Sequence, residues 1–458
     1  MDCRLGRFGD VRLDRAGADF LARMVARSTV CVRRLGGTRG GVLRFDRVLG
    51  SRRVTVEKII AGWAETTRMA AAGRHVLAIQ DTTEVKFKTS AGRRRGLGLV
   101  KKGNVHGVLA HGMIAVDAAS GACLGAVSGE VWTRTGRVSK PHRDRQLRER
   151  ESARWLRCAE HAKSILRAAA MVTVIADRES DIYAEWARLP EPGFHLLTRA
   201  SVDRRLANGG NLFAAPRNFP LAASVRLSLP QRSPGSSART ATVALRFGEV
   251  VIRRPRHEND HTLPRTLHLR LVEVREIDPP AGVEPIHWRL LTTHDVTSAV
   301  DAWRLVSWYK ARWTIEQVHR VMKSHGLDLE ESQIASADRL LKLTAAAVKA
   351  ATITIQLVQE RDGRDGLPAT TAFTLPEIET LVALGPTLEG KTLRQQNPHP
   401  SSSLAWATWI IARLGGWDCY GKPPGPITVR RGLEEFYAIN RGWHLKTYAQ
   451  HRKNPRIP

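Results

Sequence analysis

Two aspartates in the sequence end short apolar runs of the kind that form buried β-strands. Asp81 ends the run HVLAIQD, and Asp177 ends the run MVTVIAD. Reactive side chains are common at strand ends in α/β sheets, because the chain leaves the sheet there and opens a crevice. Taken singly, an aspartate after a strand is more often a helix N-cap than a reactive group, and Asp177 stands shortly before the helical pattern ESDIYAEWARL.

A third acid, Glu316, lies in WRLVSWYKARWTIEQVHRVMKSHG, a segment without Gly or Pro before Gly326 that predicts one helix. At about 100° per residue, an arc of about 80° on this helix holds Tyr309, Arg312, Glu316, Arg320 and Lys323. The opposite side, expected to face the core, holds Ile315, Val318 and Met322. A solvated stripe of ion pairs is the alternative to a reactive face, since Arg312 and Glu316 stand four residues apart.

Strand and helix patterns surround these acids. Three closely spaced apolar runs predict an antiparallel meander: His75–Asp81, Gly107–Asp117 and Cys123–Trp132. A charged helical pattern from about residue 144 to 170 follows, and then come strands that end at Asp177 and Ala200. This succession predicts an α/β fold with a mixed sheet.

Residues 201–296 differ from the rest of the chain. Val225, Leu227 and Leu229 alternate with polar residues there, and RSPGSSART and RRPRHENDHTLPR are loop-like separators, so this block predicts a half-buried all-β sheet. Helical patterns occupy the beginning of the chain and return after about residue 297. The segment DGRDGLP is a linker before the last helices.

Charge is the unusual feature of the composition. The 458 residues include 72 Lys and Arg against 44 Asp and Glu, which gives a net charge of +28. Such an excess indicates a polyanionic partner, either nucleic acid or an anionic membrane surface. The N-terminal region holds a group of seven arginines: Arg33, Arg34, Arg39, Arg44, Arg47, Arg52 and Arg53. The sequence does not decide whether these arginines form a solvated basic face or contact DNA directly.

Other features weigh against a membrane protein and a secreted protein. The longest apolar tract, Thr344–Val358, contains Lys349 and is shorter than the roughly 18 apolar residues of a spanning helix. The N-terminal residues carry charges throughout and lack the apolar core of a secretory signal. The five cysteines are scattered without a CxxC pair, which argues against a disulfide scaffold and a zinc site. An intracellular nucleic-acid-binding protein is the class that remains.

The spacing of Tyr309, Arg312, Glu316 and Lys323 resembles the Y-R-E-K signature of the bacterial DDE transposases of the insertion-sequence-four family, the group that includes the transposase of transposon five. Other segments resemble the family in the same order along the chain: FGDVRLDRAGADFL, AIQDTTEV, VIADRESDIYAEW, PIHWRLLTTH and WATWIIARLGGW. Several ordered motifs are far more specific than any one acid.

The resemblance implies an α/β fold with a ribonuclease-H-like mixed sheet, an inserted all-β subdomain, and flanking helical regions. The implied parts are an N-terminal DNA-binding region (1–70), the catalytic core (71–200), the β insertion (201–296), the rest of the core with the Y-R-E-K helix (297–360), and a C-terminal helical region for dimerisation (361–458). Asp81, Asp177 and Glu316 would be the catalytic and metal-binding triad.

The resemblance also implies roles for metal ions and for the neighbouring residues. Two Mg²⁺ ions, with Mn²⁺ as an alternative, would be held by the carboxylates, since hard oxygen ligands suit Mg²⁺ and two ions can neutralise the attacking and leaving oxygens. Phosphates would be held by Arg312, Lys323 and Arg320, the last standing where Lys is common in the family. Tyr309 would donate to a phosphate oxygen, and Arg199 matches a basic residue near the family's active site. Trp288 matches an aromatic that stacks on a flipped base in hairpin-forming members; a core tryptophan is the alternative.

The implied activity is transposition. A homodimer assembled on double-stranded DNA would bind the terminal inverted repeats of an insertion sequence, cleave the ends, and join the 3′-hydroxyls to target DNA in the bacterial cytoplasm, at the nucleoid. Two alternatives stay open: a catalytically inactive DNA-binding remnant or inhibitor of transposition, and a related two-metal nuclease without strand transfer.

Overall fold

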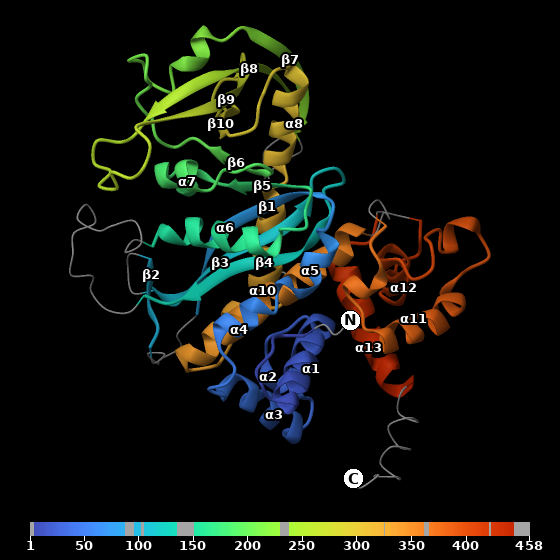
Figure 1. Ribbon diagram of the computed structural model, residues 1–458. Helices are drawn as coiled ribbons and strands as arrows, with labels where there is room; N and C mark the ends of the chain where they lie inside the picture. The colour runs from blue at the N-terminus through green and yellow to red at the C-terminus, as the bar shows by residue number, and fades with distance from the viewer. Residues whose placement is uncertain are drawn as a thin grey trace. The chain divides into compact units, whose positions relative to one another are not determined.

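The computed structural model describes residues 4–87, 96–101, 105–134, 151–229, 238–324, 326–360, 366–420 and 423–443. The chain is a mixed α/β protein that divides into two compact units (Figure 1). Unit 1 comprises residues 1–72, 82–137 and 314–458, and unit 2 comprises residues 73–81 and 138–313. Three predicted features lie wholly or mostly outside the described residues: the start of the helix from about 144, the RSPGSSART separator, and the DGRDGLP linker.

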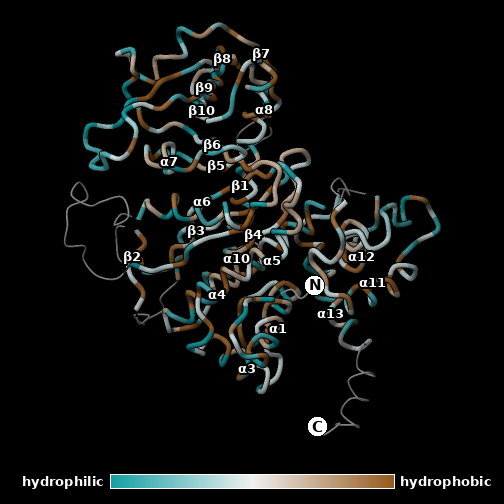
Figure 2. The backbone as a smooth tube through the Cα atoms, in the orientation of Figure 1, coloured by the Kyte–Doolittle hydropathy of each residue, from teal (hydrophilic) through white to brown (hydrophobic). Residues whose placement is uncertain are grey.

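Unit 2 contains a mixed sheet. Its strands are the part of β1 (His75–Lys86) up to Asp81, β5 (Met171–Ala176), β6 (Phe194–Arg199), β10 (His287–Thr292), β9 (Thr266–Ile277), β8 (Arg239–Arg253) and β7 (Leu221–Leu229), in this order across the sheet. The first three strands run parallel, and from β6 onward each neighbouring pair is antiparallel. The predicted mixed sheet is confirmed, and the alternating pattern of residues 201–296 forms strands that continue it (Figure 2).

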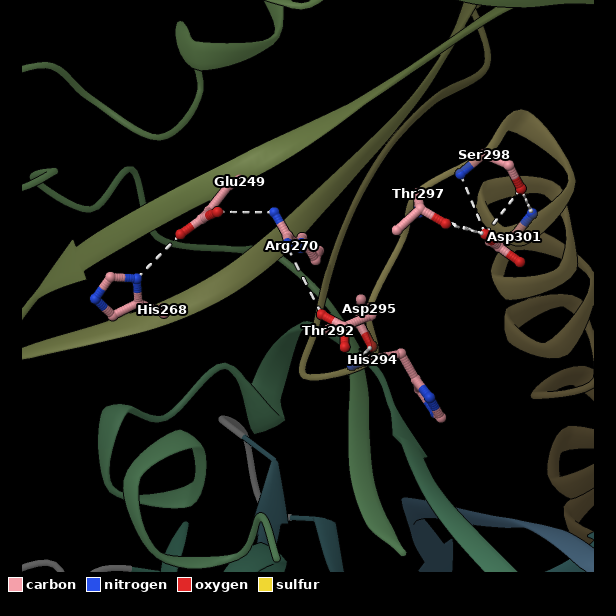
Figure 3. Close-up of polar contacts among 9 residues, drawn as sticks. All are labelled: Glu249, His268, Arg270, Thr292, His294, Asp295, Thr297, Ser298 and Asp301. Atoms are coloured by element: carbon pink, nitrogen blue, oxygen red, sulfur yellow. Dashed lines mark hydrogen bonds and ion pairs between the residues drawn. The ribbon is translucent and has the colours of Figure 1, made fainter. Parts of the chain in front are cut away.

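In the described part of unit 2, three α-helices accompany this sheet: α6 (Ala153–Ile165), α7 (Tyr183–Arg188) and α8 (Ala299–Lys310). α8 begins with a capping box, in which the Asp301 amide donates to Ser298 Oγ over 3.1 Å and the Ser298 amide donates to Asp301 Oδ2 over 3.1 Å (Figure 3). The box satisfies amide groups that have no partner inside the helix, so it fixes where α8 starts.

Unit 1 is mainly helical. Its helices are α1 (Val11–Arg27), α2 (Val32–Gly36), α3 (Arg39–Gly50), α4 (Val56–Ala61), α5 (Ala64–Ala70), α9 (Trp313–Lys323, from Thr314 onward), α10 (Ala337–Gln359), α11 (Leu375–Leu388), α12 (Leu404–Leu414) and α13 (Pro426–Trp443). Its strands are β2 (Gly98–Lys101), β3 (Val105–Asp117), β4 (Cys123–Trp132) and the end of β1. β3 pairs antiparallel with both β2 and β4.

Helix α10 is the central helix of unit 1. It is long and apolar enough to cross a membrane by length and composition, but 89% of its most apolar window is buried inside the protein. It packs against β3, β4 and the surrounding helices. Two buried lysines lie on it: Lys342 donates to the carbonyls of Leu49 and Ser51 at the end of α3, and Lys349 donates to the carbonyl of Gly62 at the end of α4. Cations are favoured at such helix ends because the last carbonyls there lack partners.

Two sequence predictions about these elements were wrong. The segment predicted as one helix is divided into α8 and α9, because the amides of Ala311 and Arg312 bond to the carbonyls three residues earlier, of Trp308 and Tyr309. This tighter turn interrupts the α-helical ladder. In addition, Asp81 does not end its strand, since β1 continues to Lys86; only its pairing with β5 stops, at Ile79.

Candidate active site

The two aspartates lie level with each other in unit 2. The last parallel pair of β1 and β5 is Ile79 opposite Ile175, and Asp81 and Asp177 each stand two residues beyond this pair. Asp177 has extended backbone angles (φ −83°, ψ −168°), which continue the direction of β5. Neighbouring strands lie about 4.8 Å apart and level residues of parallel strands point to the same face. Two aspartates that stand 96 residues apart in the sequence therefore follow the ends of the same paired strands by the same number of residues.

The alternative role of Asp177 as a cap is partly realised. Its Oδ1 accepts a hydrogen bond of 2.9 Å from the Glu179 amide and so caps the 3₁₀ turn η3 (Arg178–Ser180). The predicted helix that follows is therefore a short turn and then α7. The cap holds the Asp177 carboxylate in one orientation at the end of β5.

Arg199, on the next strand β6, continues the row of level residues that Asp81 and Asp177 begin. β5 and β6 pair Ala176 with Thr198, so the next position along brings Asp177 level with Arg199. The guanidinium is half-buried and Nη2 donates to the His287 carbonyl over 2.8 Å. Burial lowers the pKa of Arg199, and the nearby positive charge of Arg178 lowers it further.

Tyr309 and Arg312 lie beside this row. Tyr309 is buried at the end of α8, and its ring meets the Trp288 ring edge-on, with centroids 5.5 Å apart. Burial raises the pKa of Tyr309, Arg312 and Arg199 oppose that shift, and the charge of Asp177 adds to it. The phenol is thus protonated at neutral pH and can donate a hydrogen bond.

Arg312 forms an ion pair with the first aspartate. Its Nη1 lies 3.4 Å from Asp81 Oδ2, and the two side chains are only 14% and 16% exposed. Trp288 is partly exposed on β10, so it is not a fully buried core residue. Unit 2 thus brings together six of the nine residues that the sequence predicted: Asp81, Asp177, Arg199, Trp288, Tyr309 and Arg312.

The other three predicted residues lie on α9 in unit 1. Glu316, Arg320 and Lys323 share one face of this helix, with Glu316 and Lys323 partly exposed and Arg320 exposed. The predicted core face is confirmed, because Ile315, Val318 and Met322 are buried. Its burial fixes the direction in which the polar face of α9 points.

The carboxylates of unit 2 are chemically suited to a hard cation but do not form a complete ligand set. Asp81 is engaged by Arg312, and Asp177 Oδ1 by a backbone amide. Across the described part of the chain, no group of three or more His, Cys, Asp or Glu side chains is placed to hold a metal ion. The donor atoms of Asp81 and Asp177 therefore fit Mg²⁺ in kind, and the third carboxylate of the predicted triad, Glu316, belongs to unit 1.

Without a metal, the arrangement can still bind an anion. The guanidiniums of Arg199 and Arg312 and the phenol of Tyr309 are donors of the types that hold phosphate oxygens, and burial strengthens their interactions. Arg178 adds a further positive charge beside Arg199. Sequence reasoning missed Arg178, although its position directly after Asp177 was a usable signal.

No family model matches the chain. Among solved structures, the chain is similar to the piggyBac transposase in a synaptic complex with hairpin DNA, determined by cryo-EM, with 10% sequence identity and a TM-score of 0.37. The match covers 77% of this chain and 67% of that chain. A likeness of this degree supports no conclusion about the fold or the function of this protein.

Proposed function

We propose that this protein is a DDE transposase of the insertion-sequence-four type, with a ribonuclease-H-like core, that binds the inverted repeats of an element, cleaves its ends and joins the 3′-hydroxyls to target DNA. The observation that carries the proposal is the level placement of Asp81 and Asp177 on neighbouring strands, beside Arg199, Tyr309 and Arg312. The ordered motifs of the sequence and the net charge of +28 support it further.

Each residue has a role in this proposal. Asp81, Asp177 and Glu316 are the catalytic carboxylates and would hold Mg²⁺, or Mn²⁺ in its place, which lowers the barrier by neutralising charge on the reacting oxygens. Arg199, Arg312, Arg320 and Lys323 hold phosphates. Tyr309 donates its phenolic hydrogen to a phosphate oxygen.

Trp288 has a separate role. Its ring is partly exposed and lies at an interplanar angle of 70° to the Tyr309 ring. We propose that it stacks on a base extruded from the end of the element, because stacking on an aromatic ring offsets part of the cost of unstacking. The partners in this proposal are double-stranded DNA and a second copy of the chain assembled on it, in the bacterial cytoplasm.

The test is cleavage of a labelled DNA duplex that carries the inverted repeat flanking the gene, with and without Mg²⁺. We expect a cut at the boundary of the repeat only when the divalent ion is present, and no cut in a duplex whose repeat is scrambled. Ion-dependent cutting that ignores the repeat would instead indicate a nuclease without element recognition.

A second candidate is a catalytically inactive DNA-binding remnant or inhibitor. One observation favours it: Arg312 forms an ion pair with Asp81, one of the three carboxylates that the chemistry needs. In the same experiment this candidate predicts binding to the repeat with no cut under any divalent ion.

A further inference from the structure

We propose that Asp181 is a positioning residue that holds Asp177 and Arg199 level by fastening together the two chain segments that follow β5 and β6. The inference rests on the proposed function, because the role of Asp181 is to position two residues of the proposed active site. Asp181 itself is fully buried and belongs to the turn after Asp177, so it is not a catalytic residue.

The Asp181 carboxylate reaches the segment after β6 through both oxygens. Oδ2 accepts hydrogen bonds from the amides of Ser201 and Val202, at 2.9 Å and 3.1 Å. Oδ1 accepts from Arg204 Nη2 at 2.7 Å, and the same Nη2 donates to the Asp181 carbonyl at 2.5 Å. The indole of Trp186 adds a bond of 3.2 Å to Oδ1. One side chain therefore ties the turn to three residues of the next segment.

The hydrogen bonds of Asp181, called the fastening here, lie only a few residues along the chain from Asp177 and Arg199. Asp181 stands four residues after Asp177, and the turn between them is closed by bonds from the Ser180 amide to the Asp177 carbonyl and from the Asp181 amide to the Arg178 carbonyl. Ser201 stands two residues after Arg199. A shift of the Asp181 carboxylate is thus transmitted over a few residues of hydrogen-bonded backbone to Asp177 and Arg199.

Burial makes this arrangement sensitive to change. The side chains of Asp181 and Arg204 are 0% and 5% exposed, so neither can regain water if its partner is removed. A buried ion pair is weak evidence for stability, because well-packed apolar residues of similar volume often do as well. Its directional bonds do fix two segments at one separation, and an apolar pair cannot do that.

A second carboxyl, Glu185, is buried beside this cluster. Glu185 is fully buried, and this burial raises its pKa well above the usual value, with the charge of Asp181 raising it further. This shift favours the neutral form of Glu185, and the Ser180 hydroxyl donates to its Oε2 over 2.5 Å.

The first arm of the test measures the fastening itself. In Asp181→Asn, an amide nitrogen replaces one acceptor oxygen. Either the amides of Ser201 and Val202 or the donors of Arg204 and Trp186 then lose their acceptor. Hydrogen exchange of the full chain should speed up in peptides covering residues 177–188 and 196–206, and stay unchanged in peptides from β8 and β9. The matched control is Glu191→Gln, which removes one charge from an exposed side chain of the same unit.

The second arm measures the consequence for cleavage of the element end. Small displacements of reacting groups cost about ten- to hundredfold in rate, so Asp181→Asn should lower kcat by about that factor while KM for the DNA stays within about twofold. The effect should be less than additive with Arg199→Ala, because Asp181 acts partly through Arg199. Arg204→Lys keeps the charge but loses one of the two nitrogens, Nε and Nη2, that donate to Asp181 Oδ1 at 3.3 Å and 2.7 Å, and it should give a smaller loss of the same kind.

The two arms separate the failure of this inference from the failure of the proposed function. If the unmutated protein does not cut, the proposed function fails, and the exchange arm still tests the fastening. Unchanged exchange in Asp181→Asn overturns the inference, and so does faster exchange together with cleavage at the unmutated rate. If Asp181→Asn does not fold, Arg204→Lys is read by the same criteria.

Discussion

A half-buried histidine gives unit 2 a pH dependence that can be measured. His294 follows β10, its ring stacks on His195 with centroids 4.0 Å apart, and its Nε2 shares the Thr173 hydroxyl, at 2.8 Å, with His75 Nε2. Burial lowers the pKa of His294 to about 3, and the neighbouring His195 and His75 lower it further. Figure 3 shows the His294 ring directed away from Arg270 and Asp295, which pair with each other at 3.6 Å.

The sign and size of the effect follow from linkage. The pKa of His294 is about 6.5 in the unfolded chain and about 3 in the folded one, so the unfolded chain binds more protons between these values. The contribution of His294 to stability is therefore fully present above pH 6.5 and is lost as the pH falls toward 3. Between pH 7.5 and pH 5.0 the loss is about 2 kcal/mol.

The perturbation is His294→Asn, which keeps a polar partner for the Thr173 hydroxyl but cannot titrate. Urea denaturation at pH 7.5 and pH 5.0 gives the free energy of unfolding of both proteins, and the difference between them cancels the groups that they share. The unmutated protein should lose about 2 kcal/mol more than the variant over this interval. Equal losses in the two proteins would refute the reasoning, because they would show that His294 titrates alike in both states.

Three further substitutions test other parts of the structure. Tyr309→Phe removes the phenolic donor but keeps the edge contact with Trp288, so cleavage of the element end should fall about tenfold with DNA affinity unchanged; a drop in affinity alone would contradict this role. Glu185→Gln mimics the neutral acid. Because burial raises the pKa of Glu185, the unmutated protein should lose stability relative to this variant as the pH rises above the unfolded value, and parallel unfolding curves at pH 4 and pH 8 would argue otherwise. Lys349→Met leaves the Gly62 carbonyl without its charged donor and should lower the free energy of unfolding by about 2 kcal/mol, whereas an unchanged urea midpoint would speak against a role for that bond.

Local patterns predicted much of the fold. The strands β4 and β5 and helix α1 follow directly from apolar periodicity, because one buried face dictates the spacing of apolar residues. The division between α8 and α9 could not be predicted from the sequence, because the residues at Ala311 and Arg312 include no helix breaker. The interruption is a change in hydrogen bonding that residue types alone do not encode.

The sequence predicted which residues belong to the candidate site, but it did not predict how these residues are arranged in space. Motif spacing singled out Asp81 and Asp177, but only the strand register brings them level and adds Arg199 to the row. The ion pair between Arg312 and Asp81 joins residues 231 positions apart, so no local sequence pattern predicts it. The role of Asp181 was not predicted either, because its hydrogen-bond partners belong to a different segment of the chain.

The most direct test of the central claim is cleavage of the element end by single carboxylate variants of the full chain. Asp81→Asn, Asp177→Asn and Glu316→Gln should each bind the inverted repeat about as well as the unmutated protein and cut it at least about a hundredfold more slowly. The exposed Asp418→Asn should cut normally. Cutting at the unmutated rate by any one of the three variants would contradict the assignment of that carboxylate, and cutting by all three would contradict the claim that this protein works by DDE chemistry.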